Sequence, residues 1–424
     1  MLYISLVSGH DHGYIDLADA AAWPTNIAER VMTGELFVLR RCMQRLDLFD
    51  DLRAASLDGI RQVLGPEVSA RVDAEGLDQI HRFASLEQIA KITDAVYRTT
   101  ATQAARWVSK IVPDLLGVTE PYYFERRPNV RFVIPYDLMM QEADALAGVI
   151  KKHGHGKVTP HPPHRDSWVD CPTNLINIWI AVGPIPEGNG ITIFPDAFGR
   201  TLASTPSGGL ARDEHPGTPL NFDLAAGDVI LFHGNHLHSS VLNRTESTRH
   251  VVSFRVVTEK PRYAGKHYHH YVHSSLAGGP LDLVAEWPAN FAWGWVETRL
   301  IWIAERLGLT RRPGGRTNGA GRRPPSAPLP PVAVSRLSPG TIQPVSDDVC
   351  AARLADAKVV AFGRRCPHEG ADLSFGHVRD GEVVCPWHDV RFDARSGKSA
   401  CQMLQPLRLF DVQVEDDVVR VRTD

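Results

Sequence analysis

A run rich in glycine, proline and arginine interrupts the sequence at residues 311–331, which are RRPGGRTNGAGRRPPSAPLPP. Such a run offers almost no apolar side chains to bury, and its prolines favour an extended backbone, which is typical of a linker. It predicts two units that fold separately, a large one over residues 1–310 and a small one over residues 332–424. Each segment is long enough to bury a hydrophobic core of its own.

The large unit changes its pattern along the chain. Residues 1–119 are mainly helical in pattern; within residues 86–96, for example, apolar residues recur every three or four positions. Residues 120–310 contain short β-rich runs and then return to a helical pattern over residues 280–309. Evenly spaced strands of this kind predict a sandwich or jelly roll, so the expected fold class is mainly β with helices. The β-rich runs are residues 130–134, 175–182, 190–194, 229–232 and 251–257.

The composition limits the partners and the compartment of the protein. The net charge is −3 and 43 % of the residues are hydrophobic, so no global field favours nucleic acid or anionic lipid. No apolar run reaches the roughly 18 residues that a membrane-spanning helix needs. The six cysteines are scattered rather than arranged as a disulfide framework, which favours a reducing compartment. We therefore expect a cytoplasmic protein.

Two cysteine–histidine pairs lie near the C-terminus. Cys366-Pro-His368 is followed, after 16 residues, by Cys385-Pro-Trp-His388. Two cysteines and two histidines can hold structural zinc, and they can also hold a [2Fe–2S] cluster with cysteines on one iron and histidines on the other. The C-x-H and C-x-x-H arms with this gap differ from the common zinc-finger spacing. The pattern therefore favours the iron–sulfur cluster over zinc.

The segments around these pairs resemble those that small Rieske ferredoxin domains place beside their cluster loops. The matching segments are residues 369–374, 392–393 and 396–398. The resemblance covers residues 332–424 and implies a small all-β domain with a [2Fe–2S] cluster. Its ligands would be Cys366, His368, Cys385 and His388.

The resemblance is to the low-potential ferredoxin type of Rieske domain. Rieske proteins of cytochrome complexes carry one more cysteine in each cluster loop, whereas this chain has Ala371 and Trp387 at those places. The reduction potential is therefore expected toward the low end of the roughly −150 to +300 mV span of such clusters. We expect Cys350 and Cys401 to be core thiols rather than ligands.

A second group of candidate metal ligands lies in the β-rich part. His164-Arg-Asp166 supplies two members of a facial triad of two histidines and one carboxylate, the open-sided site that suits non-haem Fe(II) and O₂. Three histidines downstream, after Gly227-Asp228 and a β-rich run, compete for the remaining place. They are His233, His236 and His238.

This pattern resembles the phytanoyl-CoA dioxygenase family of Fe(II)/2-oxoglutarate oxygenases. That family places an arginine after its second ligand histidine at the spacing of 11 residues that separates His238 from Arg249 here. The resemblance spans residues 120–258 and implies a double-stranded β-helix, a jelly-roll fold, whose mononuclear iron is bound by His164, Asp166 and His238. The presence of Asp166 argues against the halogenase variant of such sites, in which this carboxylate is replaced.

The same resemblance implies how the co-substrate 2-oxoglutarate would be bound. Arg249 would grip its far carboxylate, a task that suits a planar guanidinium. Ser253 lies four residues later on the same face of the strand and would assist. Asn177 matches a position that often touches the co-substrate. The alternative is that Arg249 forms an ordinary surface salt bridge and that the histidines are core residues.

Three classes of function stay open. The first is an Fe(II)/2-oxoglutarate-dependent dioxygenase that uses O₂ to hydroxylate or desaturate a small-molecule or lipid-linked substrate. Its fused Rieske domain would keep the mononuclear iron reduced with electrons from an NAD(P)H-dependent ferredoxin reductase, or would serve as a docking module. The second is a Rieske-type NAD(P)H-driven oxygenase. It is disfavoured because such oxygenases place the cluster domain before the catalytic domain, whereas here the cluster domain comes last. The third is a ferredoxin-like electron carrier with a non-catalytic barrel, and consumption of 2-oxoglutarate separates the first class from both others.

Two features bear on the substrate and point in different directions. Arginines upstream of the triad and beside it indicate a polar or anionic substrate: Arg126, Arg127, Arg131 and Arg165. Four tryptophans in the predicted C-terminal helix of the large unit would instead suit a lipid-linked substrate or a peripheral membrane face, although packing against the protein is commoner. They are Trp287, Trp293, Trp295 and Trp302.

Overall fold

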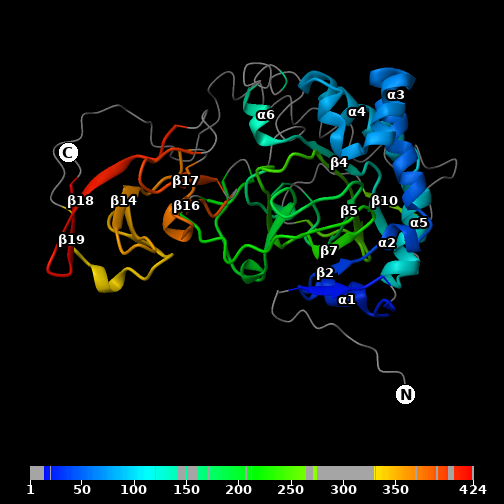
Figure 1. Ribbon diagram of the computed structural model, residues 1–424. Coiled ribbons are helices and arrows are strands. Elements are labelled where there is room, and N and C mark those ends of the chain that lie inside the picture. Colours follow the sequence, from blue (N-terminus) through cyan, green and yellow to red (C-terminus); the bar gives the residue numbers. More distant parts are fainter. Residues whose placement is uncertain are drawn as a thin grey trace, which may run out of the picture. The chain divides into compact units, whose positions relative to one another are not determined.

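The computed structural model divides the chain into two compact units (Figure 1). One contains the described residues up to Ser274 together with Trp387, and the other contains the remaining described residues from Leu329 onward. The predicted helix over residues 280–309, with its four tryptophans, and almost all of the predicted linker lie outside the described residues. The structure describes residues 14–19, 21–119, 121–141, 149, 161–169, 171–205, 208–211, 213–263, 271–274, 329, 331–367, 370–387, 390–399 and 405–422.

Helices dominate the N-terminal part of the first unit, as the sequence pattern predicted. α3 (Phe49–Glu75) packs against α4 (Leu86–Ala101), and α5 (Ala104–Leu116) follows. A capping box begins α4: the hydroxyl of Ser85 accepts from the Gln88 backbone, and the Gln88 side chain accepts from the Ser85 backbone. None of the helices in the described ranges is long and apolar enough to cross a membrane. The shorter helices are α1 (Ile27–Met32), α2 (Cys42–Arg45), α6 (Tyr136–Gln141) and a 3₁₀ turn (Leu77–Arg82).

A glycine allows α3 and α4 to approach closely. A Cβ atom added at Gly59 would lie 2.6 Å from Val96 Cγ2 and 2.7 Å from the Val96 backbone nitrogen. Because backbone atoms cannot move aside as a flexible side chain can, we expect Gly59→Ala to lower the free energy of unfolding of this unit by about 1–3 kcal/mol. Urea denaturation would measure the change. The exposed neighbour provides a control, since Asp58→Ala should change it by less than about 0.5 kcal/mol. Equal stability of Gly59→Ala and wild type would contradict the close approach.

An eight-stranded sheet forms the centre of the first unit, with strand order β1-β2-β7-β5-β9-β3-β10 and with β4 also paired to β9. β1 and β2 are parallel, whereas the other neighbours are antiparallel. Four of the five β-rich runs of the sequence fall in this sheet, as β4, β5, β7 and β9. The strands are β1 (Ile15–Leu17), β2 (Phe37–Leu39), β3 (Tyr123–Glu125), β4 (Asn129–Val133), β5 (Ile176–Ala181), β7 (Val229–His233), β9 (Arg249–Val257) and β10 (Tyr271–His273).

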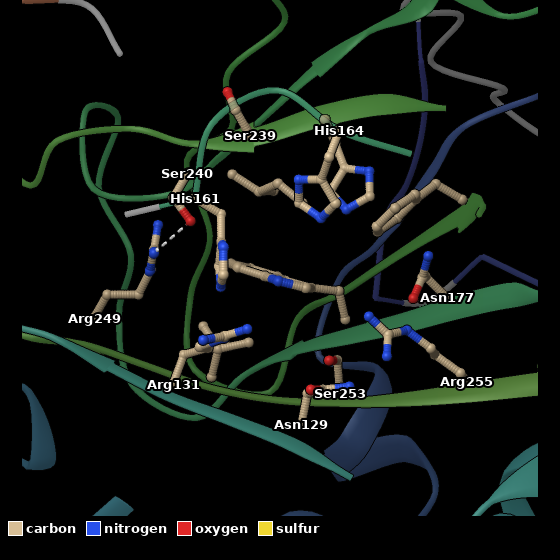
Figure 2. A pocket seen from close by; sticks show the side chains of 15 residues that line it. Asn129, Arg131, His161, His164, Asn177, Ser239, Ser240, Arg249, Ser253 and Arg255 are labelled. Carbon is tan, nitrogen blue, oxygen red and sulfur yellow. Dashed lines mark hydrogen bonds between the residues drawn. The ribbon is translucent and has the colours of Figure 1, made fainter. Parts of the chain in front are cut away.

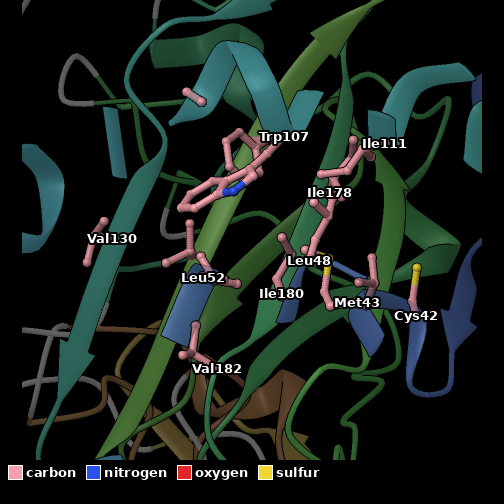
Figure 3. Packing of buried hydrophobic residues seen from close by; sticks show 14 of the residues in the cluster. Cys42, Met43, Leu48, Leu52, Trp107, Ile111, Val130, Ile178, Ile180 and Val182 are labelled. Atoms are coloured by element: carbon pink, nitrogen blue, oxygen red, sulfur yellow. The ribbon is translucent and has the colours of Figure 1, made fainter. Parts of the chain in front are cut away.

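The two faces of this sheet differ because successive strand residues point to opposite sides. On β5, Ile178 and Ile180 face the helices and belong to the main core, whereas Asn177 and Trp179 line a pocket on the other face. Figure 3 shows Trp107 and Ile111 of α5 close to the β5 isoleucines. The helices therefore bury one face of the sheet and leave the other for the pocket.

A second, short sheet pairs β6 (Ile191–Phe194) with β8 (Leu237–Ser240). Isolated bridges extend it, joining His164 to both His238 and Gly209, and Ile193 to Leu220. Apolar residues of β6 and of the pocket face of the large sheet form a shared core, which includes Ile193 and Phe232. The first unit is thus mainly β with a helical part. The double-stranded β-helix that the sequence suggested for it stays a prediction.

The second unit consists of β-strands, two 3₁₀ turns and loops in its described residues, as predicted. A six-stranded antiparallel sheet has the order β11-β19-β18-β14-β13-β12, and a three-stranded sheet has the order β15-β16-β17. Apolar residues such as Val349, Ala361 and Val419 form its core. The strands are β11 (Val332–Ala333), β12 (Ile342–Pro344), β13 (Val349–Arg353), β14 (Val359–Gly363), β15 (His377–Arg379), β16 (Glu382–Val384), β17 (Arg391–Asp393), β18 (Leu409–Glu415) and β19 (Val418–Arg422).

Candidate metal centre

His164, Asp166 and His238 come together on the pocket side of the first unit. Their ligand atoms lie within 4.8 Å of one another. The backbones of His164 and His238 exchange two hydrogen bonds, of 2.9 and 3.0 Å, so the two histidines are held side by side. Asp166 begins a 3₁₀ turn, and its backbone nitrogen donates to the carbonyl of Gly234 at 3.0 Å. Two segments far apart in the sequence thus build one group of three candidate ligands.

The ring orientations of both histidines suit metal binding. Nδ1 of His164 donates to the carbonyl of Pro162 and Nδ1 of His238 donates to the carbonyl of His236, each at 2.9 Å. A proton on Nδ1 leaves the lone pair on Nε2, which is the atom that would bind a metal. Burial, and then the neighbouring His238, lower the pKa of His164 to about 3, and burial also lowers the pKa of His238. Both rings are therefore neutral at neutral pH, which is the form that binds a metal.

The carboxylate of Asp166 is held on both sides. Asn177 Nδ2 donates to Oδ2 and Arg255 Nη2 donates to Oδ1, each at 2.7 Å. Burial alone would raise the pKa of Asp166, but Arg255, the two histidines and Asn177 hold it below its usual range. Two neutral imidazoles and one ionised carboxylate form the donor set that suits non-haem Fe(II). The three residues therefore fit such an ion.

The other two histidines that competed for the third ligand place lie elsewhere. His233 Nδ1 accepts from the backbone of Asn235 at 2.9 Å. The His236 ring stacks on Phe198, with ring centroids 4.5 Å apart. Within the described residues, the group able to hold a metal ion contains His238 and neither of these two. Of the three histidines, the tertiary structure thus brings His238 to the candidate site.

Arg249 is a buried cation in the same pocket. Its side chain is 3 % exposed, Nη1 donates to the carbonyls of Asn189 and Gly190, and Nη2 donates to Ser240 Oγ at 3.1 Å (Figure 2). No carboxylate in the described residues pairs with it. Burial, and then the charge of Arg131, lower the pKa of Arg249 to about 9. A surface salt bridge is therefore excluded as its role, and a buried cation without a counter-ion favours the binding of an anion.

The remaining predicted co-substrate residues line this pocket as well. Ser253 is 9 % exposed and faces the cavity four residues after Arg249. The hydroxyl that accepts from Arg249 is that of Ser240, which directly follows the His238-Ser239 pair. Asn177 faces the cavity too, and its amide contacts the candidate ligand Asp166 rather than Arg249. Figure 2 shows these side chains around the pocket.

Three further residues of the pocket were not assigned to the metal site from the sequence: Arg131, His161 and Arg255. Arg131 on β4 was named only as an indication of an anionic substrate, and it faces the cavity. Arg255 lies two residues after Ser253 on β9, so the period of two could have placed it on the same face. Nε2 of His161 is buried without a hydrogen-bond partner within the described part of the chain. No local pattern in the sequence distinguishes His161 from a core histidine.

A buried histidine predicts acid sensitivity of the first unit. His250 is fully buried on β9 and stacks on Phe132, with ring centroids 4.0 Å apart. Burial lowers the pKa of His250 from 6.5 to about 3. The unfolded chain therefore takes up this proton at a higher pH than the folded chain does. The neutral His250 ring therefore contributes fully to stability above pH 6.5, and this contribution is lost as the pH falls toward 3. The loss amounts to about 2 kcal/mol at pH 5.

Replacing this histidine should reduce the loss of stability in acid. His250→Phe is expected to make the free energy of unfolding fall by about 2 kcal/mol less than in wild type between pH 7 and pH 5. Urea denaturation at the two pH values would measure this. His215→Phe is the matched control, because His215 is exposed in the same unit and its replacement should leave the difference unchanged. An unaltered pH dependence in His250→Phe would contradict the prediction.

The two predicted cluster cysteines lie in loops of the second unit. Cys366 follows β14 and Cys385 follows β16, and each is 3 % exposed. Backbone hydrogen bonds close both loops, from Cys366 to Ala371 at 2.9 Å and from Cys385 to Val390 at 2.8 Å. The other two predicted ligands, at positions 368 and 388, lie outside the described residues, as does Cys401.

The remaining cysteine of this unit behaves as a core thiol. Cys350 is fully buried on β13, and burial, followed by the charge of Asp372, raises its pKa to about 12. A thiol that stays protonated is a poor ligand and a poor nucleophile. This agrees with the prediction that Cys350 is not a cluster ligand.

Comparison with known protein families matches two parts of the chain. Residues 72–251 match the family model of phytanoyl-CoA dioxygenase (PhyH), and residues 330–409 match that of the Rieske [2Fe-2S] domain. The first match contains all three residues of the candidate metal centre together with Arg249. The second contains both Cys–His pairs. Both resemblances seen in the sequence are thereby confirmed.

Individual relatives divide in the same way. The anthranilate 1,2-dioxygenase ferredoxin subunit of Burkholderia cepacia is 34 % identical over 93 residues, which are 19 % of this chain and 86 % of that protein. Phytanoyl-CoA dioxygenase domain-containing protein 1 of Danio rerio is 24 % identical over 115 residues, or 24 % of this chain and 40 % of that protein.

Among solved structures, the ferredoxin of carbazole 1,9a-dioxygenase from Nocardioides aromaticivorans IC177 is 33 % identical, with a TM-score of 0.21. The match covers 23 % of this chain and 97 % of that one. The chain thus spans most of the Burkholderia cepacia ferredoxin subunit but less than half of the phytanoyl-CoA dioxygenase relative. The chain therefore contains a phytanoyl-CoA dioxygenase (PhyH) domain, matched over residues 72–251, followed by a Rieske [2Fe-2S] domain, matched over residues 330–409.

Proposed function

We propose that the protein is an Fe(II)/2-oxoglutarate-dependent dioxygenase with a fused electron-transfer domain. The observation that carries this proposal is a buried arginine without an acidic partner in the described residues, Arg249, which lines the same pocket as His164 and His238. These two histidines form the candidate metal centre with Asp166. Bound Fe(II) would supply an oxidation by O₂ in which 2-oxoglutarate becomes succinate and CO₂ while a C–H bond of the substrate is hydroxylated or desaturated. A triad occupies three positions of a six-coordinate ion and leaves three open.

The residues of the pocket would orient the co-substrate. One carboxylate of 2-oxoglutarate would lie at the metal, and the other would accept two parallel hydrogen bonds from the guanidinium of Arg249. Ser240 already contacts Arg249 and would help to hold its side chain in place. Ser253 faces the same cavity and offers a hydroxyl to the bound anion. Asn177 would act indirectly, by holding the Asp166 carboxylate.

The charge of the pocket supports an anionic ligand. Arg131 is a second cation in the lining, and its charge contributes to the lowered pKa of Arg249. No carboxylate in the described residues pairs with either guanidinium, so two positive charges face the cavity. A dianion such as 2-oxoglutarate would offset them. An anionic group on the substrate would be attracted by the same two positive charges.

The Rieske domain would serve the oxygenase as an electron donor. The cycle with 2-oxoglutarate needs no external electron for each turnover, because the co-substrate supplies two. We propose that the cluster instead returns the mononuclear iron to Fe(II) after turnover that is not coupled to substrate, using electrons from an NAD(P)H-dependent ferredoxin reductase. The relative from Burkholderia cepacia, described as a ferredoxin subunit of a dioxygenase, supports a role in electron transfer.

The test is succinate formation by anaerobically reconstituted protein given Fe(II), 2-oxoglutarate and O₂. Succinate from the wild type would support the dioxygenase. Absence of succinate, with the mononuclear iron shown to be bound, would favour the ferredoxin-like carrier or an oxygenase driven directly by NAD(P)H. Oxidation of a substrate with NAD(P)H and a reductase in place of 2-oxoglutarate would then indicate the NAD(P)H-driven oxygenase rather than the carrier.

Loss of the [2Fe–2S] cluster should leave the initial rate of the oxygenase reaction intact. Cys385→Ala is expected to abolish the visible absorption and the electron paramagnetic resonance signal of the reduced [2Fe–2S] cluster, because a ligand thiolate is lost. Initial succinate formation should stay near the wild-type rate and then decline faster over successive turnovers. Cys350→Ala is the matched control and should retain the cluster, since Cys350 is a core thiol. An immediate loss of succinate in Cys385→Ala would contradict the accessory role.

A further inference from the structure

A buried ion-pair network lies behind the candidate metal centre and is not needed to complete its ligand set. Arg255 Nη2 donates to Asp166 Oδ1 at 2.7 Å, and Arg255 Nη1 lies 3.3 Å from Glu125 Oε2. The side chains of Arg255, Asp166 and Glu125 are 14 %, 0 % and 11 % exposed. One guanidinium thus bridges a candidate metal ligand and a second buried carboxylate.

The network continues through the pocket-lining residue Asn129 into the helical layer. Asn129 Nδ2 donates to Glu125 Oε2 at 3.4 Å, and the hydroxyl of Tyr97 donates to Asn129 Oδ1 at 3.1 Å. Tyr97 belongs to α4, Asn129 to β4, Glu125 to β3 and Arg255 to β9. The hydrogen bonds therefore tie Asp166, which lies on a short 3₁₀ turn, to four other elements of the fold.

The geometry restricts how Asp166 can turn. An ionised carboxylate offers about four lone-pair sites. Asn177 occupies one on Oδ2 and Arg255 one on Oδ1, so neither oxygen can rotate without breaking a bond of 2.7 Å. Arginine suits this bridge because its planar fork presents donors in fixed directions, whereas a lysine ammonium is a single point of charge. Removing the arginine would also leave two buried carboxylates without their shared cation.

We propose that Arg255 is a positioning residue that fixes the orientation of the Asp166 carboxylate for metal binding, and that Glu125 anchors Arg255 in turn. This inference rests on the proposed function only in assigning Asp166 as a metal ligand. It does not depend on 2-oxoglutarate or on turnover. Hydrogen-bond partners of metal ligands typically contribute about 10- to 100-fold to metal affinity.

The test is an anaerobic titration of the metal-free full-length protein with Co(II), followed by the visible absorption of the bound ion. We expect Arg255→Lys to weaken Co(II) binding by about 10- to 100-fold and to alter the shape of the bound Co(II) spectrum. Glu125→Gln should weaken binding by a smaller factor. The double variant should be no weaker than Arg255→Lys alone, because both changes interrupt one path.

A second arginine that bridges two carboxylates provides the matched control. Arg40 lies 2.6 Å from Asp16 and 2.8 Å from Asp228, and it neither lines the pocket nor belongs to the candidate metal group. The Co(II) affinity and spectrum of Arg40→Lys should therefore equal those of wild type. Thermal unfolding of each metal-free variant would show whether it folds. If Arg255→Lys fails to fold, Glu125→Gln, which keeps the size of the side chain, becomes the test variant.

The outcomes separate this inference from the proposed function. Co(II) affinity of Arg255→Lys within twofold of wild type would overturn the positioning role, whatever the protein does with 2-oxoglutarate. Wild-type protein that binds Co(II) tightly but forms no succinate would overturn the proposed dioxygenase and leave the positioning role in place, provided that Arg255→Lys binds the metal more weakly.

Discussion

His238→Ala is expected to abolish both binding of the mononuclear iron and succinate formation. The ring of His238 lies beside the ring of His164 and the carboxylate of Asp166, and it is fixed by the hydrogen bond from Nδ1 to the carbonyl of His236 at 2.9 Å. Loss of a direct ligand should exceed the effect of losing an outer-shell partner, so Fe(II) affinity should fall by more than about 100-fold. Iron analysis after anaerobic reconstitution and desalting would measure the loss, and succinate should fall to the background.

The neighbouring histidines make this prediction specific. His233→Ala and His236→Ala remove rings from the same segment, yet neither ring belongs to the group that can hold a metal within the described residues. Both variants should retain one mononuclear iron per chain. His236→Ala removes a ring that stacks on Phe198 and should lower the unfolding temperature instead. Retention of iron by His238→Ala, with loss in His236→Ala, would reverse the assignment of the third ligand.

Arg249→Leu is expected to raise the dissociation constant of 2-oxoglutarate by roughly 10²- to 10⁴-fold. Hydrogen bonds to charged groups contribute about 1.5–3 kcal/mol each, and two parallel bonds would be lost with the guanidinium. Iron binding should remain, because Arg249 contacts carbonyl oxygens and Ser240 rather than a candidate metal ligand. Isothermal titration with 2-oxoglutarate under anaerobic conditions, on protein that contains iron, would measure the change.

A conservative variant separates charge from geometry at this position. Arg249→Lys keeps the positive charge but loses the planar fork, so its affinity for 2-oxoglutarate should lie between those of wild type and Arg249→Leu. Wild-type affinity in Arg249→Leu would mean that another cation anchors the co-substrate. Arg131 is the other cation of the same lining without an acidic partner in the described part of the chain, and it would be the next residue to replace.

The Gly227-Asp228 pair, which precedes the candidate ligand His238, serves the fold rather than the chemistry. Asp228 is buried, and its carboxylate accepts from the backbones of Arg41 and Ala225 and from the Arg40 guanidinium, at 2.7, 3.0 and 2.8 Å. Gly227 has a φ of +88°, which suits a glycine at this turn. Together they join the start of β7 to the segment before α2. The pair therefore positions the strand that precedes the candidate ligand without entering the pocket.

Much of the architecture could be predicted because its signals are local. The β-rich runs that the sequence predicted are present as β4, β5, β6, β7 and β9, and the helical pattern before them is present as α3, α4 and α5. Short strands such as β1 and β2 were missed, because three residues are too few to show a period of two. Their place depends on pairing with strands that are distant in the sequence.

The sequence by itself determined the two-part organisation, the ligand types and the spacing between them, because each of these is carried by residues close together in the chain. Short spacings in the chain define the two Cys–His pairs, the pair of His164 and Asp166, and the 11 residues from His238 to Arg249. Only the tertiary structure decided that Ser240 contacts Arg249 and that Asn177 and Arg255 hold Asp166. The reason is physical: the period of two assigns a residue to a face of its strand, whereas the register between distant strands decides which side chains meet on that face.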